Sequence, residues 1–263
     1  MLENYKLSTG KLALVSFLFF FISLGVVSAG TQGDLWDSAV RVYHLNGDAF
    51  DSRMGLNNGT VSGAVNTSGI LGDAYEFDGV NDKITLGVIG TDYPASWNMW
   101  VKQKISLTKM GALGRYYEQD GYIVDSADNT RWMLRMGGGL EYATGSGQGT
   151  KDIWRMATMT YNGTDVLYYN NGTLYAQDTT SGNITHLTRS WQLATSGNNA
   201  DYWNGTIDEV TFYNDSITQT EIDYLYNSGV GNELERETPV SEYPCESTWE
   251  VMYDNPNIPA LRC

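Results

Sequence analysis

Carboxylate groups dominate the side chains in this sequence that could do chemistry, because 31 Asp and Glu stand against 16 Lys and Arg. The formal net charge of −15 disfavours phosphate backbones and anionic bilayer surfaces, so nucleic acid is not an expected partner. Only two histidines, His44 and His186, and two cysteines, Cys245 and Cys263, could supply nitrogen or sulfur ligands. Zinc sites and histidine-based catalysis are therefore not expected.

The elements that must position these groups are short strands. Runs of β-branched and aromatic residues, separated by Gly, Asn and Asp clusters, follow one another from Ala39 onward, and no helical segments alternate with them. This pattern predicts an antiparallel all-β fold, with its clearest hairpin at Asn170-Asn171-Gly172, where a tight turn needs positive φ. The expected strands are residues 40–43, 74–77, 83–86, 97–103, 122–124, 131–136, 155–161, 166–169, 173–176 and 206–213.

One short helix is expected near the C-terminal end of this region. Thr218-Gln219-Thr220-Glu221 forms a capping box, and Gly229 can end the helix. Ile222, Leu225 and Tyr226 give the helix an apolar face, which we expect to pack on the edge of a sheet.

Residues 12–29 form an apolar run that follows Lys6 and Lys11 and ends in the small residues of Val27-Ser28-Ala29. This pattern is typical of a signal peptide cleaved before Gly30. The alternative is an uncleaved N-terminal anchor, which would be the chain's only contact with a membrane. In both cases residues 30–263 are expected to be secreted or on the cell surface.

The folded domain is expected to span residues 30–229, followed by an acidic linker and tail at 230–263. Because an exported chain meets an oxidising compartment, Cys245 and Cys263 are expected to form a disulfide; the alternative is two free thiols.

Seven Asn-X-Ser/Thr sequons are candidates for glycosylation in an exported chain, although the same residues also favour turns. They are Asn58, Asn66, Asn162, Asn171, Asn183, Asn204 and Asn214.

Four blocks of sequence between about Val40 and Gly229 have a familiar order and spacing. They are residues 43–47 with the turns up to 72, residues 74–82 (AYEFDGVND), residues 96–102 with 154–164, and residues 204–210 (NGTIDEV) leading into the capped helix. In these blocks the chain resembles the laminin G-like, concanavalin A-like jelly-roll superfamily, of the bacterial and archaeal exported type. The resemblance implies two antiparallel sheets packed face to face as a β-sandwich.

The resemblance does not imply an enzyme. Glycosidases of this superfamily carry a Glu-x-Asp-x-Glu run, whose alternate carboxyls face one sugar, and this sequence has none. Asp208 and Glu209 are adjacent, so they are expected to point to opposite faces of their strand.

The resemblance does suggest calcium. Relatives often place the carboxylate of a structural Ca²⁺ at the position of Asp208, and Asp51 in the loop after the first strand is its expected partner. The alternative is that both carboxylates cap turns through backbone N–H groups.

A second possible calcium site rests on residues 122–134, which resemble a pentraxin segment whose Asp-Asn pair binds calcium. Asp128-Asn129 occupy that place, and Asn199 and Asp201 lie in the expected partner loop. The alternative is that all four residues serve only in turns.

A sugar-binding face is predicted from strand alternation. In residues 97–102 the apolar set is Trp97, Met99 and Val101, which leaves Asn98, Trp100 and Lys102 on the other face, and Arg131 and Arg135 are assigned outside the core in the same way. Trp100 would stack on a sugar ring while its polar neighbours bind hydroxyl groups.

The sequence therefore predicts an exported, non-catalytic binding or adhesion module whose partner is a glycan or an extracellular protein. The alternative is a structural spacer or a subunit of a surface assembly, and a polysaccharide-acting enzyme is less favoured.

Overall fold

The computed structural model describes residues 24–90, 95–105, 109–116, 120–124, 130–136, 139–145, 150–180, 182–184, 188–197 and 199–236. The Asp128-Asn129 pair, His186 and both cysteines lie outside these ranges, as does most of the predicted signal peptide. The predicted disulfide therefore stays a prediction, and nothing in the structure tests the predicted cleavage before Gly30.

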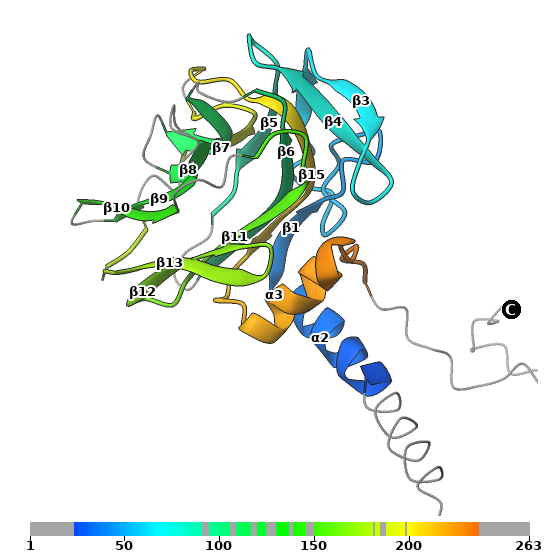
Figure 1. Ribbon diagram of the computed structural model, residues 1–263, viewed down its shortest axis with the longest axis vertical. Coiled ribbons are helices and arrows are strands. Elements are labelled where there is room, and N and C mark those ends of the chain that lie inside the picture. Colours follow the sequence, from blue (N-terminus) through cyan, green and yellow to red (C-terminus); the bar gives the residue numbers. More distant parts are fainter. Residues whose placement is uncertain are drawn as a thin grey trace, which may run out of the picture.

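Two antiparallel sheets pack face to face (Figure 1), as predicted. The first sheet has the order β13-β12-β11-β6-β15-β4-β3, with β1 also paired to β15, and the second has the order β10-β9-β8-β7-β14-β5-β2. The strands of the first sheet are β1 (Ala39–Tyr43), β3 (Val65–Ser68), β4 (Asp73–Asp78), β6 (Ala95–Gln103), β11 (Arg155–Tyr161), β12 (Asp165–Asn170), β13 (Thr173–Thr179) and β15 (Asn204–Tyr213). Those of the second are β2 (Thr60–Ser62), β5 (Lys83–Val88), β7 (Met110–Tyr116), β8 (Asp120–Val124), β9 (Thr130–Met136), β10 (Gly139–Gly145) and β14 (Ser190–Leu193).

The core between the sheets is aromatic. Trp97 lies at its centre, with its ring centroid 5.0 Å from that of Trp191 and 6.1 Å from that of Trp132. Met99 and Val101 of the same strand belong to this core, so the predicted inward set of β6 is confirmed. Burial of these side chains supplies the main driving force for pairing the two sheets.

Every strand expected from the sequence forms, but β2, β3, β7, β10 and β14 were not expected. Strand β7 lacks a β-branched run and contains Gly111 and Gly114. A Cβ at either position would lie 2.2 to 2.3 Å from backbone atoms of Ser196. These glycines therefore allow the backbone of β7 to lie close to the backbone at Ser196, which strand propensity does not reveal.

The predicted helix forms as α3 (Gln219–Tyr226), with the complete capping box of Thr218 and Glu221, and is followed by the short 3₁₀ turn η1 (Asn227–Gly229). It does not pack on a sheet edge as expected. It lies across the outer face of the first sheet, where the Tyr226 ring stacks on Trp100 with centroids 5.8 Å apart.

A helix before the first strand was not expected. Helix α2 (Leu24–Ser38) crosses the predicted cleavage point and lies beside α3 (Figure 1). Leu35 and Trp36 are buried in a second apolar cluster with Trp100, Met156 and residues of α3. In the part of the chain that the structure describes, we find no helix with both the length and the hydrophobicity that spanning a bilayer requires.

Replacing Trp100 tests how strongly the helices are held on the sheet. Trp100 is 2% exposed, so Trp100→Ala is expected to lower the free energy of unfolding by about 3 to 5 kcal/mol. Val80→Ala, at a side chain that is 69% exposed, should change it by less than about 0.5 kcal/mol. Urea unfolding followed by circular dichroism measures both. Equal effects of the two changes would contradict the packing of α3 on Trp100.

Candidate functional site

The predicted sugar-binding surface is not exposed. Strand alternation places Trp100 on the outer face of the first sheet, as expected, but α2 and α3 cover it there. Asn98 is also buried, and it accepts a hydrogen bond from the Thr158 hydroxyl at 2.6 Å. The prediction that Trp100 stacks on a sugar is therefore wrong, because the helix that was expected at a sheet edge lies on this face.

The remaining residues of that predicted surface belong to two different sheets. Lys102 is part of the first sheet, and its ammonium lies 4.7 Å from the centre of the Trp154 ring. Arg131 and Arg135 belong to β9 of the second sheet. The predicted surface therefore combines residues from two different sheets.

A β-bulge in β15 places two carboxylates on the same side of the strand. Pairing with β6 shifts register between Asp208 and Thr211, and Glu209 has a φ of 48°. Ile207 and Val210 both lie in the core between the sheets, so the two residues between them are directed away from it. The expectation that Asp208 and Glu209 point to opposite faces is wrong for this reason.

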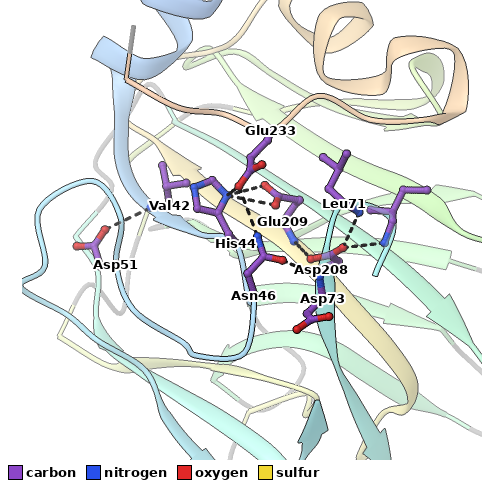
Figure 2. Close-up of polar contacts among 10 residues, drawn as sticks. Val42, His44, Asn46, Asp51, Leu71, Asp73, Asp208, Glu209 and Glu233 are labelled. Atoms are coloured by element: carbon purple, nitrogen blue, oxygen red, sulfur yellow. Dashed lines mark hydrogen bonds and ion pairs between the residues drawn. The ribbon is translucent and has the colours of Figure 1, made fainter. Parts of the chain in front are cut away.

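Asp208 serves as a buried acceptor for a turn. Its Oδ2 accepts hydrogen bonds from the backbone N–H groups of Ile70 at 2.8 Å and Leu71 at 3.2 Å, and Oδ1 accepts from Glu209 at 2.9 Å (Figure 2). Burial, together with the negative charge of Glu209, raises the pKa of Asp208 to about 8.

Asp51 does not join Asp208. Its Oδ1 accepts from the Arg53 N–H at 3.1 Å, and its Oδ2 lies 3.4 Å from Arg41 Nε. Figure 2 shows Asp51 on the far side of His44 from Asp208. Because N–H donors occupy positions that a cation would need, the two carboxylates do not fit the predicted shared calcium site, and the turn-capping alternative describes them.

The second predicted calcium set can be followed only in its partner loop. Asn199 accepts a hydrogen bond from the Lys83 ammonium, and Asp201 accepts from the Ser196 hydroxyl at 3.0 Å and lies 3.6 Å from Lys109 Nζ. With Asp128 and Asn129 outside the described residues, this calcium site stays a prediction.

His44 forms a cluster that the sequence analysis did not find. Its Nδ1 lies 3.0 Å from Glu209 Oε2 and 3.5 Å from Glu233 Oε1 (Figure 2). Burial alone would lower the pKa of His44, but the hydrogen bond to Glu209 and the nearby carboxylates raise it above its usual value. Burial also raises the pKa of Glu209. The sequence signal was weak, because the three residues come from distant segments.

Glu233 lies in a segment that was expected to be a linker. Residues 231–236 continue along the domain, with Leu234 only 1% exposed. Asn232 N–H donates to the Leu225 carbonyl, and Gln32 of α2 donates to the Glu235 carbonyl at 3.1 Å. The folded part therefore extends past the expected boundary at residue 229.

An open groove of about 440 Å³ lies where α2, the loop after β1 and this C-terminal segment meet. Trp36, Asp37, Arg53 and Arg236 line it together with Gly33. The Arg53 guanidinium lies 5.2 Å from the centre of the Trp36 ring, and its Nε donates to the Ala39 carbonyl. The two guanidiniums could donate hydrogen bonds to hydroxyl or acidic groups of a ligand, and the Asp37 carboxylate could accept hydrogen bonds from its hydroxyl groups.

The sequons differ in how their amides are used. Asn58, Asn66, Asn162, Asn183 and Asn214 are exposed, whereas Asn171 and Asn204 are half-buried. Asn204 donates its Nδ2 hydrogen to the Asp78 carbonyl at 2.6 Å. Asn66 likewise donates its Nδ2 hydrogen to Asp73 Oδ2 at 3.2 Å. Glycosylation would modify this nitrogen at either residue, and occupancy of all seven sequons stays a prediction.

Comparison with known families identifies the class of protein. A laminin G model of the concanavalin A-like lectin/glucanases superfamily matches residues 78–223, more than half of the 263 residues. The chain therefore belongs to this superfamily. Among curated protein sequences, none matches the chain.

Solved structures share the fold at low sequence identity. Domain 4 of AbnA, a GH43 extracellular arabinanase from Geobacillus stearothermophilus, solved with arabinotriose, has a TM-score of 0.56 and 18% identity over 70% of this chain and 96% of that one. The binding domain of Paraclostridial Mosquitocidal Protein 1 has a TM-score of 0.63 and 16% identity over 74% of this chain and 53% of that one. The ligand binding domain of botulinum neurotoxin serotype D, in complex with N-acetylneuraminic acid, has a TM-score of 0.59 and 14% identity over 76% of this chain and 53% of that one. The chain thus spans about half of each toxin domain.

The raised pKa of Asp208 predicts how stability depends on pH. A carboxyl with a folded pKa of about 8 and an unfolded pKa of about 3.9 stabilises the fold fully below about pH 4, and this stabilisation is lost as the pH rises through 8. The free energy of unfolding should therefore fall between pH 4 and 8. Asp208→Asn should reduce the slope, by at most about 1.4 kcal/mol per pH unit for one proton.

Urea titrations at a series of pH values measure that slope. Asp152→Asn is the matched control, because it removes an exposed carboxylate at a φ of 57°, which Asn tolerates. An equal reduction of the slope in both variants would mean that overall negative charge, not the buried carboxyl, causes the pH dependence.

Proposed function

We propose that this chain is an exported, non-catalytic carbohydrate-binding module. The observation that carries the proposal is membership of a lectin and glucanase superfamily, combined with structural similarity to domains solved with arabinotriose and with N-acetylneuraminic acid. The apolar run at residues 12–29 supports export.

The buried state of the acidic pair supports a non-catalytic role. Asp208 is 0% and Glu209 4% exposed, and both are engaged in hydrogen bonds within the fold. A glycosidase needs two carboxyls that reach opposite sides of one glycosidic bond, one of them with a proton to donate. Neither carboxyl of this pair is open to a polysaccharide.

The groove at α2 is the surface we assign to the glycan. Its volume of about 440 Å³ falls within the usual range for small-ligand sites. Arg53 and Arg236 supply planar donors, which favour hydroxyl groups or a carboxylated sugar as ligand. The two positive charges stand in a domain whose net charge is strongly negative. Cleavage before Gly30 would shorten α2 but leave Gly33, Trp36 and Asp37 in the groove.

A structural spacer is the second candidate function. The observation that favours it is the burial of Trp100 and Asn98, which closes the face of the first sheet to a ligand. A module of this kind would act through its surfaces in an assembly and would bind no free sugar.

A glycan array compares the two functions. We expect the secreted chain to bind a subset of glycans, and Arg236→Ala and Arg53→Ala each to weaken that binding at least tenfold, because each removes a charged donor from the groove. Lys151→Ala, at an exposed lysine outside the groove, should bind as the wild type does. No binding to any sugar or extracellular protein would favour the spacer, and hydrolysis of a polysaccharide panel would contradict the non-catalytic role.

A further inference from the structure

We propose that His44, Glu209 and Glu233 bind a divalent transition metal ion, with Zn²⁺ as the best fit. They are the His, Cys, Asp or Glu residues whose donor atoms gather within 4.8 Å of one another among the residues that the structure describes. His44 directly follows β1, Glu209 lies at the bulge of β15, and Glu233 comes from the segment after η1. Figure 2 shows the three side chains directed toward one another.

The spacing of the donor atoms suits a tetrahedral ion. His44 Nδ1 lies 3.0 and 3.2 Å from the two oxygens of Glu209 and 3.5 Å from Glu233 Oε1. Ligands at the usual Zn–N and Zn–O distances of about 2.0 to 2.1 Å stand about 3.3 Å apart at the corners of a tetrahedron. All three donor atoms lie within 4.8 Å of one another, so an ion could replace the proton between His44 and the carboxylates once the side chains move in around it.

The chemistry of the three donors also selects the ion. One imidazole nitrogen and two carboxylates match the ligands of Zn²⁺ and of similar first-row ions. Calcium requires six to eight oxygen ligands, which this cluster does not supply. With His44 neutral, the two carboxylates carry two negative charges, which a divalent ion would neutralise.

Burial is graded across the cluster in a way that would suit a bound ion. The Glu209 side chain is 5% exposed and the His44 side chain 14%, so both are fixed within the fold, whereas Glu233 is 37% exposed and leaves a path for the ion and a water ligand. Asn46 supports the arrangement, because its Nδ2 donates to Glu233 Oε1 at 3.4 Å and its Oδ1 accepts from the Asp73 N–H at 2.7 Å. Such outer contacts orient metal ligands.

The expected consequence is a metal-dependent attachment of the C-terminal segment. Glu233 is the residue of that segment that would ligate the ion, while His44 and Glu209 belong to the sandwich. An ion bound to all three would join residues 231–236 to β1 and β15, and metal binding would stabilise the folded chain by mass action.

Isothermal titration calorimetry with Zn²⁺ on tag-free protein, first stripped with EDTA, tests the proposal. All samples carry Cys245→Ser and Cys263→Ser, so that no thiol can bind zinc. We expect one equivalent of Zn²⁺ to bind at pH 7.5 and Ca²⁺ not to compete. His44→Ala and Glu233→Gln should each weaken binding at least tenfold, since even outer contacts of a metal site are worth 10- to 100-fold.

Glu235→Gln is the matched control for Glu233→Gln, because it removes an exposed carboxylate of the same segment that is not part of the cluster. Visible absorption of the Co²⁺ form should show the intense bands of a four-coordinate ion in the wild-type cluster and lose them in Glu233→Gln. Circular dichroism checks that each variant folds. Zinc binding that is equally tight in Glu233→Gln and in Glu235→Gln, or no binding in the folded parent protein, would overturn the proposal whether or not the chain binds glycans.

Discussion

The bulge in β15 determines where two buried carboxylates of this domain, Asp208 and Glu209, lie. Without it, strict alternation would direct Glu209 into the aromatic core beside Ile207, where an unpaired carboxylate would be very costly. The extra residue instead sends both carboxylates outward. Asp208 then holds the turn at Ile70 and Leu71, and Glu209 holds His44. A single irregularity in a central strand thus connects three segments that are distant in the sequence.

On the outer face of the first sheet, as at the bulge in β15, strand alternation alone does not predict the tertiary structure. Trp100 lies on that face as alternation requires, but a large aromatic there can be either a ligand platform or the base for a covering helix. Tyr226 and Leu225 decide between these, because they give α3 an apolar face that must be buried somewhere. The capping box fixed where the helix begins, but it contains no information about which surface the helix covers.

The parts of the structure that the sequence could predict are those governed by local periodicity. The inward set of Trp97, Met99 and Val101, the hairpin at Asn171 and the N-cap at Thr218 all follow from alternation or from turn and capping chemistry, and the structure confirms them. The missed features depend on contacts between distant residues. The bulge at Glu209 lacks the glycine that marks many bulges, and β7 was missed because its glycines pack against the backbone near Ser196. The His44 cluster combines residues 165 and 24 positions apart in the chain and so leaves no motif.

The segment at 231–236 links the two surfaces to which we assign binding. Leu234 is buried against the helices, which fixes the backbone on either side of it. Glu233, on one side, then reaches His44, and Arg236, on the other, lines the groove with Trp36 and Arg53. Glu233 and Arg236 thus lie within two residues of the same buried leucine, although the cluster and the groove share no side chain. An ion at His44 would bind Glu233 directly, so the proposed metal site and the groove would both depend on one short stretch of chain.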